Sequence, residues 1–203
     1  MKKVNKFAVI MLDILEMFIV GLAVFILVYA FVGQLLRITG DSMAPTLHND
    51  EQIIAEKLSG RLRALERGEI VIFRHPERAD VPLIKRVIGL PGEKFEIKEG
   101  KVFINDLPLN EPYTTEETYG GESIHTDVNI IIPNGEYVLL GDNRSNSSDS
   151  RKWGTIKHEN ILANAFLVYY PIDNVRLIDS KLGVQNAVKL VRDKVNNGNK
   201  LSF

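Results

Sequence analysis

One long apolar stretch stands out near the start of the chain. Residues 17–36 are apolar except for Gln34, and about 20 such residues in a helix cross the hydrocarbon core of a bilayer. The stretch therefore predicts a single transmembrane helix over 17–36, behind an N-terminal segment 1–16. Two alternatives fit less well, because a cleaved signal peptide has a shorter apolar part with a small-residue cleavage site behind it, and a buried core helix is rarely apolar on all sides at this length.

The charged residues before the apolar stretch indicate its direction. Lys2, Lys3 and Lys6 precede the span. Asp13 and Glu16 also lie there, but acidic residues count little in the positive-inside rule. We therefore expect the N-terminus in the cytoplasm and everything after the span on the far side of the membrane.

Behind the span the pattern changes to short runs of β-branched and aromatic residues between turn formers. This pattern predicts a mainly β domain over 37–171. The polar, turn-rich residues 110–127 are expected to form a surface excursion from it. The expected strands are 52–55, 69–73, 83–88, 94–98, 101–104, 129–132, 137–140 and 165–170.

The β pattern fades in the C-terminal tail, 172–203. Val184, Val188, Val191 and Val195 fall at helical spacing there, which predicts an amphipathic helix. Such an apolar stripe either packs on its own domain or lies on the membrane surface.

Length and composition restrict the classes of function. A chain of 203 residues allows one anchor and one compact domain, not two large domains. The net charge of −1 and the lack of a basic block argue against a nucleic-acid partner, since recognition of nucleic acid needs clustered Lys and Arg. There is no cysteine, so a disulfide framework, a thiolate nucleophile and a zinc–thiolate site are excluded. Any nucleophile must be an oxygen or an amine.

The first candidate for chemistry is Ser42, in the segment 39–47 directly after the span. Gly40 permits a tight backbone path and Pro45 fixes φ, so the segment can hold the Ser42 hydroxyl and N–H in a rigid loop. Taken alone, a serine in such a loop is more often a turn or capping residue than a nucleophile.

The second candidate is Lys85, in the segment 81–93. On a strand, alternation places Lys85 on the same face as Leu83 and Val87. Loss of solvation among apolar neighbours lowers a lysine pKa from about 10.4 and yields a neutral amine that can take a proton from a serine hydroxyl. The alternative is an edge-strand lysine that discourages aggregation.

The third segment, 141–151, is dense in turn formers and polar side chains. By itself it is typical of a solvated loop. Beside the other two segments it gains a second interpretation, because a neutral lysine needs a hydrogen-bond partner and an Asp149–Arg151 ion pair could hold that partner rigidly.

In this order, behind an N-terminal anchor, the three segments resemble the conserved boxes of the type I signal peptidases. In that family G-x-S-M-x-P-T-L supplies the nucleophile, K-R-V-I-G-L-P-G-[DE] the general base, and G-D-N-R-x-x-S-x-D-S-R the support of the site. The resemblance implies that Ser42 is the nucleophile and Lys85 the general base. It also implies that Ser147 orients the lysine and that Asp149 and Arg151 form a structural ion pair.

The same resemblance implies the fold, activity and location. We expect an antiparallel β catalytic domain on the outer face of a bacterial plasma membrane, working as a serine endopeptidase that removes signal peptides from exported preproteins at small-x-small sites. No metal, no cofactor and no oligomer is required, and the expected partners are preproteins and membrane lipid. Position in the motifs assigns Ile38, Met43, Leu47 and Ile84 to the substrate pocket.

Two departures from the family pattern matter. Some members carry a serine where Gly40 stands, and its hydroxyl helps to stabilise the oxyanion, so here the Ser42 backbone N–H has to contribute more. The segment between Gly92 and Gly141 is short, which is similar to the compact Gram-positive branch of the family.

Three other functions are weighed against this one. A Ser–His hydrolase would use one of the four histidines, although none of them lies in a triad motif. A noncatalytic membrane-tethered β module is disfavoured because both Ser42 and Lys85 are present. An autocatalytic repressor would carry a DNA-binding head in place of the span. The histidines are His48, His75, His125 and His158.

Overall fold

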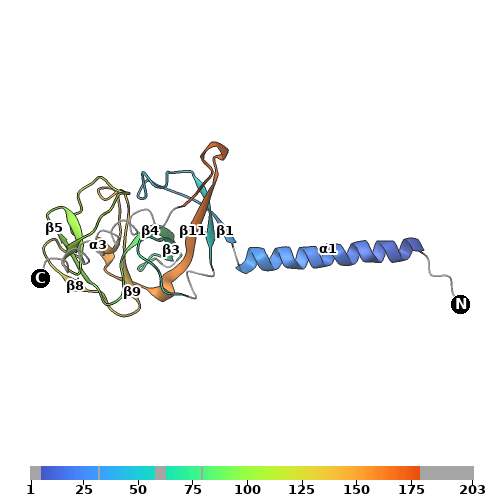
Figure 1. The fold of residues 1–203 in the computed structure, drawn as a ribbon, viewed down its shortest axis with the longest axis horizontal. Coiled ribbons are helices and arrows are strands. Elements are labelled where there is room, and N and C mark those ends of the chain that lie inside the picture. The colour runs from blue at the N-terminus through green and yellow to red at the C-terminus, as the bar shows by residue number, and fades with distance from the viewer. Residues whose placement is uncertain (1–5, 32, 58–62, 79, 179–203) are drawn as a thin grey trace, which may run out of the picture.

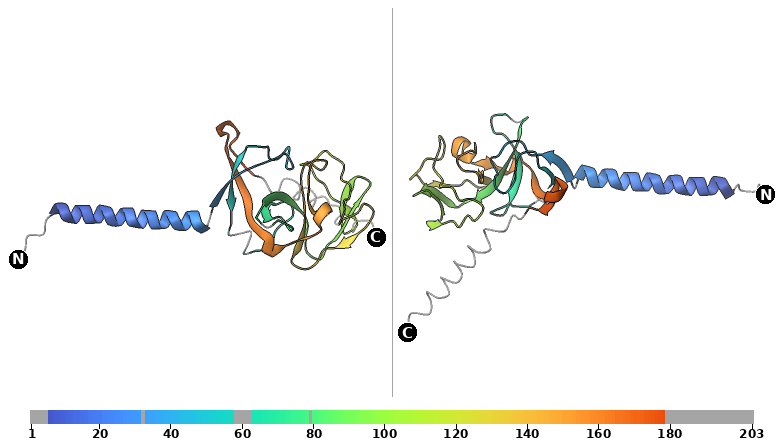
Figure 2. Two further views of the ribbon diagram at one scale, coloured as in Figure 1. Left: turned by 180° about the vertical axis from the view of Figure 1, so that it is seen from behind. Right: turned by 90° about the horizontal axis from the view of Figure 1, so that it is seen from above.

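The computed structural model describes residues 6–31, 33–57, 63–78 and 80–178. Within them, a long N-terminal helix extends from one end of a β domain (Figures 1 and 2). The helix predicted around Val184 to Val195 lies outside the described residues.

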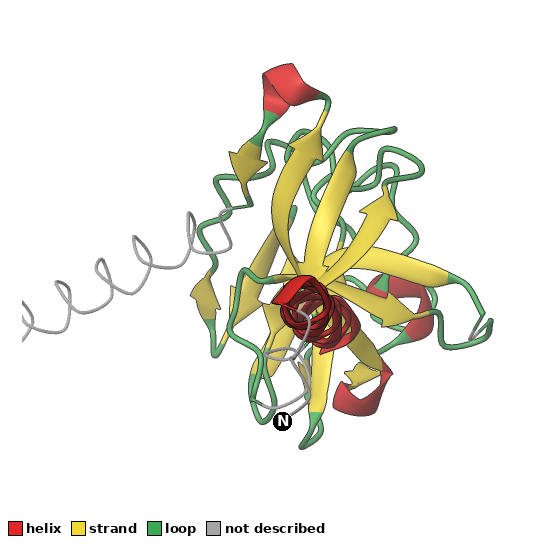
Figure 3. Cartoon of the chain, turned by 90° about the vertical axis from the view of Figure 1, so that its right-hand side faces the viewer, coloured by secondary structure: helices red, strands yellow, loops and turns green. Residues whose placement is uncertain are grey.

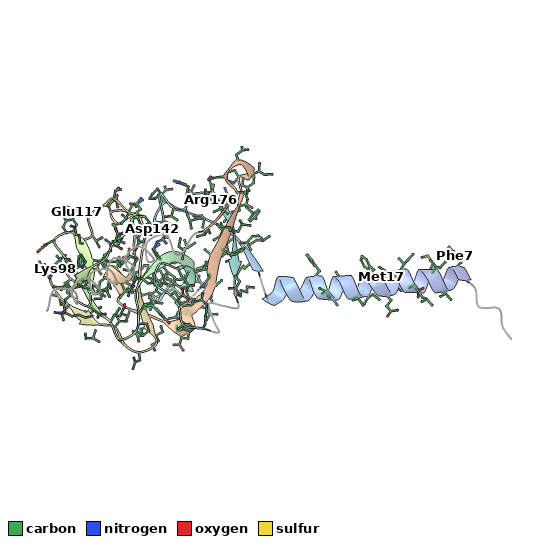
Figure 4. The ribbon with its side chains drawn as sticks, viewed as in Figure 1. Phe7, Met17, Lys98, Glu117, Asp142 and Arg176 are labelled. Atoms are coloured by element: carbon green, nitrogen blue, oxygen red, sulfur yellow. The ribbon has the colours of Figure 1, made fainter. Side chains whose placement is uncertain are left out.

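Helix α1 spans Lys6–Phe31. Its segment Val9–Ile26 is long and apolar enough to cross a membrane, and none of that segment is buried against the other described residues. Phe7 and Met17 project outward from it (Figure 4), and a view along the helix shows the strands of the β domain behind it (Figure 3). An apolar helix without a protein partner is what a bilayer would solvate.

The span predicted over 17–36 differs from the helix at both ends. The helix begins at Lys6 and ends at Phe31, and the residues that follow form strand β1 (Gly33–Arg37). This strand pairs antiparallel with β2 (Gln52–Glu56), with Arg37 opposite Gln52. An apolar run does not by itself distinguish helix from strand, and here pairing with a distant strand decides.

The β domain contains two sheets, and all named strand pairs are antiparallel. The larger has the order β1-β2-β11-β3-β4-β9-β10, with β12 added beside β11; the smaller has the order β7-β6-β5-β8. The predicted mainly β, antiparallel fold is confirmed. The remaining strands are β3 (Ile70–Arg74), β4 (Pro82–Gly89), β5 (Lys94–Lys98), β6 (Lys101–Ile104), β7 (Leu107–Pro108), β8 (Ile130–Ile131), β9 (Glu136–Leu140), β10 (Ile156–Lys157), β11 (Ile161–Tyr170) and β12 (Arg176–Leu177).

Strand β4 is covered on both faces. Leu83 and Val87 pack with one cluster of buried apolar residues, and Ile84 packs against another. This agrees with the alternation expected from the sequence. Lys85 therefore lies in a strand whose neighbouring positions are packed rather than solvated.

Two expectations for the domain need correction. The domain does not end at residue 171, because β12 pairs with β11 and Ile178 packs against a core cluster. The excursion 110–127 carries no named strand, but it is not wholly on the surface: Thr118 and Ile124 are both buried. Packing between segments that are far apart in the sequence, which composition does not reveal, accounts for both differences.

Candidate active site

Ser42 and Lys85 meet between two elements that are distant in sequence. Ser42 lies in the loop between β1 and β2, and Lys85 lies in the middle of β4. The Lys85 Nζ donates to the Ser42 Oγ at 2.7 Å and to the Ile84 carbonyl oxygen at 2.9 Å. The position of Lys85 on β4 and its bond to the Ile84 carbonyl together direct its amine toward the Ser42 hydroxyl.

Burial sets the protonation of Lys85. The residue is only 3% exposed, and this desolvation lowers its pKa from 10.5 to about 8. The negative charges of Asp149 and Asp142 oppose the shift, while Arg151 adds to it. A substantial fraction of Lys85 is therefore neutral at mildly alkaline pH.

Interactions within the loop itself fix the conformation of the segment that carries Ser42. Gly40 has a φ of 89°, a conformation that strongly favours glycine, and its N–H donates to the Asn49 side chain at 2.8 Å. None of the hydrogen bonds among the described residues uses the Ser42 N–H, so this donor remains open to a substrate oxygen.

A single turn in this loop directs Met43 and Leu47 inward. The Leu47 N–H donates to the Met43 carbonyl at 2.9 Å, and both side chains are fully buried in a core cluster. They were expected in the substrate pocket. Because residues four apart in such a turn share one face, both pack beneath the pocket instead.

A pocket of about 320 Å³ opens beside Ser42 and Lys85. Ile38, which directly follows β1, and Ile84, which lies in β4, both line it. Its walls are mainly apolar. The lining residues are Leu36, Arg37, Ile38, Thr39, Ser42, Ile53, Ile72, Val81, Pro82, Leu83, Ile84 and Lys85.

The segment 141–151 packs its backbone directly against Ser42. The Asn143 N–H donates to the Ser42 carbonyl at 3.2 Å. A Cβ placed on Gly141 would lie 2.5 Å from that same carbonyl and 2.2 Å from the Ser147 Oγ. Only glycine allows this approach, which fixes the position of Ser42 from behind.

Ser147 does not orient the lysine directly in this structure. Its Oγ donates to Asp149 at 2.7 Å, and the hydrogen bonds of the described residues include none between Ser147 and Lys85. The Lys85 Nζ donates instead to the Ile84 carbonyl oxygen, and an orienting role for Ser147 stays a prediction. Ser147 acts one step further away, on the carboxylate of Asp149.

Asp149 and Arg151 form a buried, two-point ion pair. The Arg151 Nε and Nη2 each donate to one carboxylate oxygen at 2.8 Å, and the Gly141 N–H donates to the same carboxylate at 3.0 Å. Burial by itself would raise the pKa of Asp149, but the hydrogen bonds and charge of Arg151 outweigh it and lower that pKa. The carboxylate also caps the short helix α3 (Ser150–Trp153).

A second buried ion pair was not predicted from the sequence. The Arg86 Nε and Nη2 donate to Asp142 at 2.8 and 2.6 Å, and the Thr46 hydroxyl donates to Asp142 at 2.5 Å. This network joins β4, the Ser42 loop and the segment 141–151 (Asp142 is labelled in Figure 4). Each partner lies within a segment already singled out, but nothing in the sequence pairs them.

Arg176 ties the end of the domain to the same loop. It donates to both carboxylate oxygens of the buried Glu51 at 2.8 Å and to the Thr46 carbonyl at 2.8 Å. Figure 4 labels this residue on the side of the domain nearer to α1. The expected boundary at 171 excluded it from the domain.

The four histidines lie elsewhere. His75 packs on Trp153 at 4.7 Å between ring centroids, and His158 lies beside Tyr137. His48 and His125 are exposed. No hydrogen bond among the described residues joins a histidine to Ser42, and no group of three acidic or histidine side chains in that part of the chain could hold a metal ion.

Comparison with known proteins identifies the family. Residues 11–170 match the family described as signal peptidase, peptidase S26. The chain is 37% identical over 156 residues to the probable signal peptidase I-2 of Synechocystis sp., and the alignment covers 73% of this chain and 68% of that protein. It is 33% identical over 181 residues to signal peptidase I U of Bacillus subtilis, which covers 87% of this chain and 95% of that protein.

Solved structures of similar chains exist as well. A signal peptidase I from Enterococcus faecalis V583 aligns with a TM-score of 0.43 and 29% sequence identity, over 50% of this chain and 97% of that chain. The family match in sequence covers more than half of the chain and agrees with the resemblance of the three motifs. The chain therefore belongs to the signal peptidase family, peptidase S26.

Proposed function

We propose that this protein is a membrane-bound serine endopeptidase that removes signal peptides from exported preproteins, with Ser42 as nucleophile and Lys85 as general base. The observation that carries the proposal is the 2.7 Å contact between the Lys85 Nζ and the Ser42 Oγ in a pocket that is mainly apolar. Nucleophile and base within hydrogen-bond reach, with the base itself oriented, are the geometric requirement for an activated serine.

The chemistry follows from the state of Lys85. In its neutral form the amine has a lone pair, which accepts the Ser42 proton as the serine oxygen attacks the scissile carbonyl carbon. The Ser42 N–H donates to the oxyanion that develops. The Lys85 ammonium then gives its proton to the leaving amine, and the resulting ester on Ser42 is hydrolysed by a water that Lys85 deprotonates in turn.

The substrate binds as an added strand. The open pocket lies between the end of β1 and the first half of β4, and both segments have a free edge there. An extended peptide can pair with such edges while alternate side chains enter the pocket. A shallow apolar pocket accepts small side chains, which fits cleavage at small-x-small sites.

The anchor places this chemistry at the membrane surface. With the N-terminus in the cytoplasm and the segment Val9–Ile26 of α1 spanning a bacterial plasma membrane, the β domain faces outward, where an exported preprotein emerges. Enzyme and substrate then share one membrane plane, which raises their effective concentration. A single chain supplies both Ser42 and Lys85, so an oligomer is not required.

The test of this function is cleavage of a defined preprotein. The full-length protein in detergent micelles is incubated with a preprotein that carries one Ala-x-Ala site, and both product ends are identified by mass. We expect one cut, directly after the second alanine. No cleavage, or cleavage at scattered sites, would contradict the proposal and would favour a noncatalytic module or a different peptidase.

The pH profile provides a separate prediction. Because Lys85 acts in its neutral form and its pKa is about 8, kcat/KM should rise about tenfold per pH unit from pH 6 to near 8 and then level off. The profile is measured with a substrate that has no titratable group near the cut, and circular dichroism checks that the fold is unchanged. A profile that is flat from pH 6 to 9 would exclude Lys85 as the base.

A further inference from the structure

The segment around Arg37 forms one wall of the substrate pocket, and hydrogen bonds on the side away from the pocket fix its backbone. The Ile38 N–H donates to the Glu51 carbonyl at 2.8 Å, and the Asp50 N–H donates to the Ile38 carbonyl at 3.0 Å. Successive residues of a strand direct their backbone groups to opposite edges. Arg37 therefore directs its own N–H and C=O away from β2, toward the free edge of β1 and the cleft.

Side chains alternate along this wall as well. Leu36 and Ile38 point inward and pack on the core cluster beneath the pocket. The Arg37 side chain points the other way and is 66% exposed. A substrate residue directly opposite Arg37 would have its side chain on the same face as the guanidinium, while its two neighbours would face the pocket.

The charge on this face is not symmetric about the cleft. The Arg37 Nε and Nη2 donate to the same oxygen of Asp50, at 3.1 and 2.8 Å, which leaves Nη1 without a partner among the described residues. Arg37 lines the pocket, whereas Asp50 is not among the described residues that line it. A substrate in the pocket therefore lies against the Arg37 segment rather than against Asp50.

We propose that Arg37 is a specificity-determining residue, which rests on the proposed function. It favours an acidic residue and disfavours a basic residue at the middle position of the small-x-small site. The small residues on either side enter the pocket, and the middle side chain lies beside the guanidinium. Opposite charges on one face of neighbouring strands attract and like charges repel, so Arg37 both favours an acidic and disfavours a basic middle residue.

The test uses three preproteins that differ only in the middle residue of the site, which is Glu, Gln or Lys. They compete for the full-length protein in detergent micelles, and mass spectrometry gives the ratio of kcat/KM values. For the natural sequence we expect Glu to be preferred over Lys by about 3- to 10-fold, with Gln in between. In about 0.5 M salt the preference should shrink, because both side chains are exposed to solvent.

Three variants test whether the charge of Arg37 causes the preference. Arg37→Gln should bring the Glu-to-Lys ratio close to one, and Arg37→Lys should retain most of it. Asp50→Asn should increase the ratio about twofold, because it releases the guanidinium. Each ratio is internal to one variant, so a change in overall activity does not affect it.

The outcomes separate this inference from the function on which it rests. Cleavage of all three preproteins with the same ratio in the natural sequence and in Arg37→Gln would overturn the role of Arg37 and leave the peptidase function intact. A ratio that falls in Asp50→Asn would also overturn it. Cleavage of none of the three by the natural sequence would overturn the proposed function, and the role of Arg37 with it.

Discussion

Replacing Ser42 with Ala, or Lys85 with Met, should lower kcat by about 10⁴-fold or more, and the double variant should be no slower than either single variant. The two side chains act as one unit through their 2.7 Å contact, so removing either one removes the activated nucleophile. Single-turnover cleavage of an Ala-x-Ala preprotein measures the loss. Lys157→Met, which changes an exposed strand lysine, is the matched control and should retain full activity.

Stability distinguishes lost chemistry from lost structure in these variants. The pKa of Lys85 is lowered in the folded state, so the unfolded chain binds more protons between pH 8 and 10.5 and folding becomes more favourable as pH rises through that range. At pH 7 the protonated, buried Lys85 destabilises the folded state by about 3 kcal/mol. Lys85→Met removes this cost but also loses two hydrogen bonds. Because two hydrogen bonds together contribute about 1–3 kcal/mol, we expect the variant to be about 0–2 kcal/mol more stable than the natural sequence. Retention of a tenth of the activity, or a clear loss of stability, would contradict the assignment of Lys85.

Asp142→Asn should lower the free energy of unfolding by about 3–5 kcal/mol. The Asp142 and Arg86 side chains are 0% and 3% exposed, so the change leaves a buried guanidinium without its counter-charge. Contact of Arg86 with the Tyr113 ring, 4.1 Å from its centroid, recovers only part of the loss. Urea titration in detergent micelles measures the effect through the fluorescence of Trp153, the only tryptophan.

The matched control for this variant is Asp50→Asn. It breaks the Arg37–Asp50 pair, in which both side chains are more than 60% exposed. An exposed pair contributes little, so the expected change is below about 1 kcal/mol. Equal effects of the two variants would contradict the structural role of the buried pair. A second consequence is a loss of activity in Asp142→Asn alone, because the carboxylate that accepts from both Thr46 and Arg86 then no longer ties the Ser42 loop to β4.

Much of the site was predictable because its chemistry is concentrated in short segments. A serine in a glycine-containing loop, a lysine on an apolar strand and an Asp–Arg pair in a polar segment each have a recognisable composition. Their order behind an apolar helix then gave the family. The pairing of Arg86 with Asp142 was not predictable, since the two residues lie 56 positions apart and no local pattern relates them.

The remaining differences between expectation and structure share one origin. Residues 33–36 were expected to be helical, Met43 and Leu47 were expected in the pocket, and Ser147 was expected to orient the lysine. In each case the side-chain type was informative, but its partner was contributed by a distant strand, by a local turn or by a neighbouring carboxylate. Composition shows that a group avoids water or needs a hydrogen bond, but not which group satisfies it.

The sequence by itself determined that this protein has an apolar N-terminal helix, a β domain and the residues of a serine–lysine peptidase, because these features depend on hydrophobic periodicity and on residue types in short motifs. Only the tertiary structure decided which carbonyl aims Lys85, which ion pair fixes the Ser42 loop and which strand edge presents Arg37 to a substrate. Those features depend on contacts between segments that are far apart in the chain, and such contacts form only when burial and backbone pairing are satisfied together.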